Sequence, residues 1–179
     1  LNAIAFSIGE KSKMENKNVL GLDLSLSCTG YSIVRYDQQS YLILDYGTIK
    51  TKQADFNNTI ERLAHICEEI QNILDSNEID IIVIEDSIPV KNSKSVLQVN
   101  VLKGMVIRTI QYNNKEIQLY YPSTVKKKVT GSGRASKEDV ANAIKEKTNI
   151  DIEYSDKNNS KKTSDIFDSI ALCICYLEK

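Results

Sequence analysis

The chain has 179 residues, of which 41% are hydrophobic and 26% charged, and its formal net charge is -1. This composition is typical of one globular domain with its own core, and it excludes disordered chains and membrane proteins. No apolar run approaches the roughly 20 residues of a membrane-spanning helix, so we expect no membrane segment.

The first residues do not resemble a targeting signal. Residues 1–13 precede Met14, a plausible native start, and they lack a basic region followed by a long apolar core. We therefore expect 1–13 to be an added extension and 14–179 to be a single domain. The cysteines form neither a CxxC pair nor a regular framework, so we expect reduced core residues at Cys28, Cys67, Cys173 and Cys175.

The first half of the chain predicts a meander followed by a helix. Three segments rich in Ile, Leu, Val and Tyr are separated by short polar breaks, which is typical of antiparallel strands: 19–26, 30–36 and 41–49. Asn58 and Glu61 have the spacing of a capping box, and apolar residues recur at helical intervals to about Asp75.

The second half alternates strands and helices. The apolar run 80–85 predicts a strand buried on both faces. The helix expected over 95–112 has a wide apolar stripe, which could serve the core alone or also a partner subunit. Further on we expect a short strand at 117–121, a helix capped by Ser136 and ending near 147, a polar loop at 151–162, and a terminal helix from Ser164.

Four carboxylates occupy unusual settings in this pattern. Asp23 lies inside an apolar strand, where an ionised carboxylate is costly without a compensating cation or hydrogen bonds. Glu85 ends a buried strand, where open α/β sheets place their ligands. Asp165 and Asp168 are three residues apart and project from one face of a first helical turn.

Together these acids favour a metal site. Four converging carboxylates repel one another unless divalent cations neutralise them, and ligands that are all oxygen favour Mg²⁺ or Mn²⁺ over zinc. Two ions about 3.5 to 4 Å apart would catalyse phosphodiester hydrolysis. Taken alone, three of these acids also have a simpler explanation. Asp165 and Asp168 could merely stabilise the helix dipole, and Glu85 could be an ordinary surface acid.

The segment 121–137 is strongly basic and contains no acid. Its glycines, Gly131 and Gly133, would let the backbone approach a phosphate closely. We interpret it as a nucleic-acid phosphate surface, and the alternative is a solvated charged loop. The basic residues are Lys126, Lys127, Lys128, Arg134 and Lys137.

Four motifs, in this order, resemble the RuvC family of Holliday-junction resolvases: GLDLSLSCTGYS, IIVIEDS, YPSTVKKKVTGSGRASKEDV and SDIFDSIALC. The resemblance extends from Val19 to the C-terminus. It implies an α/β fold of the RNase H-like type, a five-stranded mixed sheet flanked by helices, and a homodimer. The family's metal-binding acids fall on Asp23, Glu85, Asp165 and Asp168, and its DNA-contacting lysines on Lys126 and Lys137.

One position departs from the family. The resemblance places Ile88 where bacterial members carry a Phe that wedges into the junction, and Ile cannot stack on a base. We therefore expect a different mode of junction opening and action on a wider range of branched DNA. The abundance of Lys, Asn and Ile suggests a phage or a low-GC bacterium as the source.

The sequence thus predicts a homodimeric endonuclease with two Mg²⁺ ions per site, replaceable by Mn²⁺, that cleaves Holliday junctions in the cytoplasm of a bacterial host. Three alternatives stay open. One is a ribonuclease acting on RNA/DNA hybrids, and another is a DNA-binding module with a degenerate site. The third is an ATPase related to actin and sugar kinases, which would need two such domains and a second glycine-rich loop.

Overall fold

The structure is a computed structural model, and it describes residues 16–86, 94–156 and 162–179. Among these residues, no helix has the length and apolar character needed to cross a membrane. Ile88, the residue at the expected wedge position, lies outside the described residues.

The described strands form one mixed sheet in the order β3-β2-β1-β4-β5. β1 pairs antiparallel with β2 and parallel with β4, while β3 continues the meander and β5 the parallel half. This confirms the expected five-stranded sheet. The strands are β1 Val19–Asp23, β2 Cys28–Tyr36, β3 Tyr41–Lys50, β4 Ile81–Glu85 and β5 Glu116–Tyr120.

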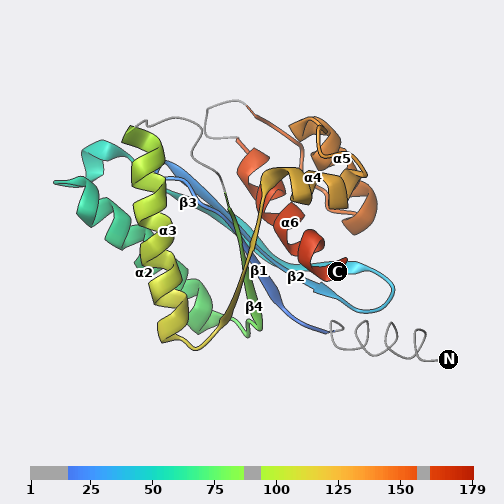
Figure 1. Cartoon of the computed structure of the whole chain (residues 1–179), viewed down its shortest axis with the longest axis horizontal. Coiled ribbons are helices and arrows are strands. Elements are labelled where there is room, and N and C mark those ends of the chain that lie inside the picture. The colour runs from blue at the N-terminus through green and yellow to red at the C-terminus, as the bar shows by residue number, and fades with distance from the viewer. Residues whose placement is uncertain (1–15, 87–93, 157–161) are drawn as a thin grey trace.

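Helices cover both faces of this sheet (Figure 1). On one face lie α2 Thr59–Ser76 and α3 Lys94–Tyr112, and a short 3₁₀ turn, η1 Gln53–Asp55, precedes α2. On the other face lie α4 Pro122–Thr130, α5 Lys137–Thr148 and α6 Ser164–Leu177.

The central strands β1 and β4 contribute to two cores because alternate side chains point to opposite faces. Val19 and Val83 pack toward α6, whereas Leu20 and Ile82 pack toward α2 and α3. Strands that are covered on both faces have continuous apolar sequences, and this pattern predicts β1 and β4. α6 is buried along almost its whole length.

Two expectations about local structure need correction. β1 ends at Asp23 rather than at residue 26, because Thr29 Oγ1 donates to the Ser25 carbonyl over 2.7 Å and closes a turn there. The basic segment is not only a loop, since α4 begins with Pro122 in its first turn and buries Val125. Gly131, with φ 82°, ends this helix, which gives it a structural role.

The expectation that the cysteines are core residues holds for part of them. Cys173 and Cys175 of α6 are buried in one core and half-buried Cys67 packs against the other core, whereas Cys28 is half-buried and belongs to neither core of the described residues.

Candidate active site

Two glycines let α6 lie directly on the backbone of the sheet. A Cβ atom on Gly30 would overlap the carbonyl of Asp165, and one on Gly21 would overlap the carbonyl of Ser169. Gly30 is also the register partner of Asp23 across the β1–β2 ladder. The first turn of α6 is therefore held against the end of β1 at the position of Asp23.

This packing brings the predicted acids together. Asp23, Asp165 and Asp168 each offer a carboxylate oxygen, and these oxygens lie within 4.8 Å of one another. Glu85 ends β4, the strand next to β1. Its charge raises the pKa of Asp23, and the charge of Asp168 in turn contributes to the raised pKa of Glu85, after burial. Three acids thus form a tight cluster, with Glu85 beside it.

The cluster is electrostatically strained without a cation. Burial raises the pKa of Asp23 to about 8, and the carboxylates of Asp168, Glu85 and Asp165 add to this rise. Burial, followed by the charge of Asp168, likewise raises the pKa of Glu85. Such shifts mean that the site disfavours its own negative charge, which a bound divalent cation would relieve.

Asp165 supplies an independent sign that a ligand belongs here. Its Oδ2 atom is buried and has no hydrogen-bond partner among the described residues. A buried acceptor without a partner is costly, so such an atom calls for an explanation such as a bound ion.

The donor set also fits a hard cation. The clustered ligand atoms are carboxylate oxygens, which suit ions such as Mg²⁺ rather than zinc. The nearby Cys28 thiol is held neutral, because burial, together with the negative charge of Asp165, raises its pKa to about 11. The residues present therefore fit a divalent metal ion held by oxygen ligands.

Two lysines pair with the clustered acids. The Nζ atom of Lys137 lies 2.7 Å from Asp168 Oδ2, and that of Lys162 lies 2.7 Å from Asp165 Oδ1. Burial of Lys137 acts to lower its pKa, but its hydrogen bond to Asp168 and the negative charges of Asp168, Asp23 and Asp156 together outweigh this, so the pKa is raised. The sequence predicts that Lys137 contacts DNA, and in the structure its ammonium pairs with one of the four acids.

The other predicted basic residues divide into two groups. Lys126 Nζ donates to the Ala135 carbonyl over 2.7 Å, and Lys128 Nζ donates to the Glu178 carbonyl over 2.8 Å. Lys127 and Arg134 are exposed, and within the described part of the chain their side chains form no hydrogen bond or ion pair. These two cations are free to meet a ligand.

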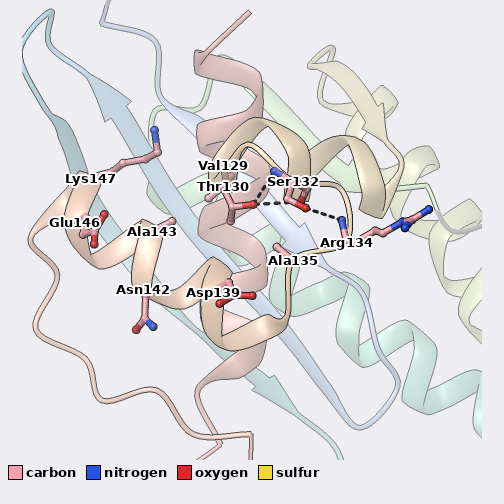
Figure 2. A pocket seen from close by; sticks show the side chains of 10 residues that line it. All are labelled: Val129, Thr130, Ser132, Arg134, Ala135, Asp139, Asn142, Ala143, Glu146 and Lys147. Atoms are coloured by element: carbon pink, nitrogen blue, oxygen red, sulfur yellow. Dashed lines mark hydrogen bonds between the residues drawn. The ribbon is translucent and has the colours of Figure 1, made fainter.

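A surface pocket between α4 and α5, of about 720 Å³, lies at the edge of the basic segment. Figure 2 shows that Arg134 turns its guanidinium away from Glu146 and Lys147, which line the far side of this pocket. None of the four acids lines it. The pocket is therefore separate from the carboxylate cluster.

Arg62 is a supporting residue that sequence reasoning missed. Its side chain is buried, donates over 2.9 Å to the carbonyl of Leu26, and also bonds Thr51 and Gln53. It thereby ties the loop that follows Asp23 to α2 and the end of β3. The sequence does contain a sign of its burial, because Arg62 lies four residues before Ile66 and therefore on the same buried face of α2.

The matching family model and two similar curated relatives carry the same description. The family model described as "Crossover junction endodeoxyribonuclease RuvC" matches residues 19–176. A protein of that name from Alkaliphilus oremlandii is 32% identical over 88% of this chain and 91% of its own length. One from Fusobacterium nucleatum is 31% identical over 89% of this chain and 79% of its own length.

A solved structure shows the same fold. The T. thermophilus RuvC structure in complex with a Holliday junction substrate has a TM-score of 0.75. It is 19% identical, and the match covers 89% of this chain and 92% of that one.

Proposed function

Because the chain belongs to the RuvC family of crossover junction endodeoxyribonucleases, we propose that it cleaves Holliday junctions by metal-dependent hydrolysis of phosphodiester bonds. The observation that carries this proposal is the cluster of Asp23, Asp165 and Asp168, with Glu85 beside it. We further propose that residues 14–179 form one nuclease domain preceded by an extension, and that it acts on DNA in a bacterial cytoplasm.

We assign the four acids to a site for two Mg²⁺ ions, with Mn²⁺ as a substitute. The charges of Asp168, Glu85 and Asp165 all act on Asp23, so we assign Asp23 as the central ligand that would hold the metal. When bound, such ions activate a water molecule and stabilise the leaving oxygen of a phosphodiester. Lys126 and Lys137 lie near enough to Glu85 for their charges to act on it, so they stand at the rim, where a DNA phosphate would enter.

Metal depletion tests this assignment. We expect the protein to nick a synthetic four-way junction in Mg²⁺, to stop in EDTA, and to resume when Mg²⁺ or Mn²⁺ is restored. Full activity in EDTA would contradict the metal assignment.

The two free cations give a prediction about DNA binding. If Lys127 and Arg134 contact DNA phosphates, replacing either one by Gln weakens junction binding and lowers the slope of log K against log salt by about 1. The same change at Lys17, which precedes β1 at the opposite end of the strand from Asp23, should leave the slope unaltered. Binding titrations at several salt concentrations measure this slope. If all variants had the same slope as the wild type, neither Lys127 nor Arg134 would contact DNA phosphates.

We also propose a homodimer, because cutting a four-way junction on two strands needs two active sites and a closed two-fold dimer supplies them. The proposed interface is the outer face of α3. Leu97 and Val101, one helical turn apart, are 58% and 54% exposed there, while Leu102 and Val106 fill the core. An exposed apolar strip of this kind is typical of a contact surface.

Introducing a charge into this strip should break the dimer. We expect Val101→Glu to shift the protein to monomers in sedimentation experiments and to uncouple the paired cuts. Ile60→Glu on α2 is the matched control, since Ile60 is 74% exposed but lies outside the strip. A wild-type protein that is monomeric at working concentration would overturn the dimer.

A further inference from the structure

Lys162 is an unusual neighbour for a metal ligand. Its ammonium lies 2.7 Å from Asp165 Oδ1, the side chain of Asp165 is 6% exposed, and that of Lys162 is 24% exposed. The ion pair is therefore largely shielded from water, where charges interact more strongly than at the surface.

The backbone beside Lys162 is held firmly. The next residue, Thr163, donates its backbone N–H to the Ser155 carbonyl over 2.9 Å and its hydroxyl to the Glu153 carbonyl over 2.8 Å. The backbone N–H of Ser155 in turn donates to the Thr163 hydroxyl over 2.8 Å. These three hydrogen bonds fix the backbone at the start of α6, directly beside Lys162, whose ammonium pairs with Asp165.

The two oxygens of Asp165 differ in what they contact. Oδ1 has the ammonium of Lys162 and the hydroxyl of Ser164 at 3.3 Å, whereas Oδ2 is buried without a partner among the described residues. Lys162 thus neutralises the carboxylate from one side and leaves the other oxygen available. An ammonium and a divalent cation at one carboxylate repel each other, so they compete.

We propose that Lys162 is a positioning residue that stands in for the metal ion: its ammonium holds Asp165 in the metal-free protein and withdraws when a divalent cation binds. This inference rests on the proposed function, because it takes the acid cluster to be a metal site. The inference goes further in one respect: the ammonium of Lys162, which the metal ion displaces, sets the affinity of the site for metal.

Metal titration of the protein without DNA tests the inference. We expect Lys162→Met to bind Mn²⁺ roughly tenfold more tightly than the wild type, because a competing charge is gone, and to melt at a lower temperature when metal-free. Lys162→Arg keeps the charge and should bind like the wild type. Lys147→Met is the matched control: it breaks a 2.7 Å pair with Glu178 away from the four acids, so it should lower stability without changing Mn²⁺ affinity.

A second measurement needs no variant. Acylation of amines followed by mass spectrometry should show that Lys162 in the wild type becomes more reactive when Mn²⁺ is added. Unchanged or weaker Mn²⁺ binding by Lys162→Met, or unchanged Lys162 reactivity, would overturn the inference while leaving the nuclease assignment in place. A wild-type protein that binds no Mn²⁺ at all would instead overturn the metal site itself.

Discussion

Replacing Asp23 by Asn should abolish junction cleavage and leave junction binding intact. Burial raises the pKa of Asp23 to about 8, and the charges of Asp168, Glu85 and Asp165 all act on it. An amide cannot supply the negative charge that holds a cation between them. We expect cleavage to fall by roughly 10³-fold or more, since metal activation contributes several kcal/mol to the reaction.

The same variant should be more stable than the wild type when metal-free. A neutral amide removes a carboxyl whose pKa is raised by burial and by repulsion from its neighbours, and the variant should lose the rise in melting temperature that Mg²⁺ gives the wild type. Asp75→Asn, at the exposed end of α2, is the control and should cut normally. Unchanged cleavage by Asp23→Asn would remove this residue from the site.

Replacing Gly30 by Ala should have the second-largest effect. The new methyl group would overlap the backbone of Asp165, so the first turn of α6 must move away from β1 and carry two acids with it. We expect a loss of about 1 to 3 kcal/mol in the free energy of unfolding, as for other overpacked sites, together with loss of cleavage.

The stability control for this variant is Gly104→Ala. Gly104 lies within α3, on the face that carries Val101, and in the single protomer it has open space where a methyl group would be added, so alanine should preserve or raise the stability of the protomer by up to about 1 kcal/mol. Urea unfolding of the two variants measures the difference. A Gly30→Ala protein with wild-type stability and cleavage would show that close packing of α6 does not position the acids.

Much of the scaffold was predictable from local pattern. Strands covered on both faces leave continuous apolar runs, and the acids Asp23 and Glu85 stand out because they interrupt or end such runs. The helical spacing of Asp165 and Asp168 placed both on one turn. The structure confirms that these segments lie next to one another, because the β1–β4 pairing and the packing of α6 join them.

What the sequence could not reveal depends on contacts between distant segments. Three such contacts join residues far apart in the chain: the ion pair of Lys137 with Asp168, the hydrogen bond from Arg62 to Leu26, and the close packing of Gly30 against Asp165. α4 was missed because its lysines obscured the two valines that it buries. The effect of Ile88 at the wedge position stays a prediction.

The measurement that tests the central claim most directly is a cleavage assay in Mg²⁺ with matched four-way, three-way, linear duplex, single-stranded and RNA/DNA hybrid substrates, with every cut mapped. The account predicts symmetric paired nicks in the four-way junction, weaker cutting of other branched DNA, and none in linear duplex. Cutting confined to the RNA/DNA hybrid, or no cutting of any branched DNA in Mg²⁺ or Mn²⁺, would contradict it.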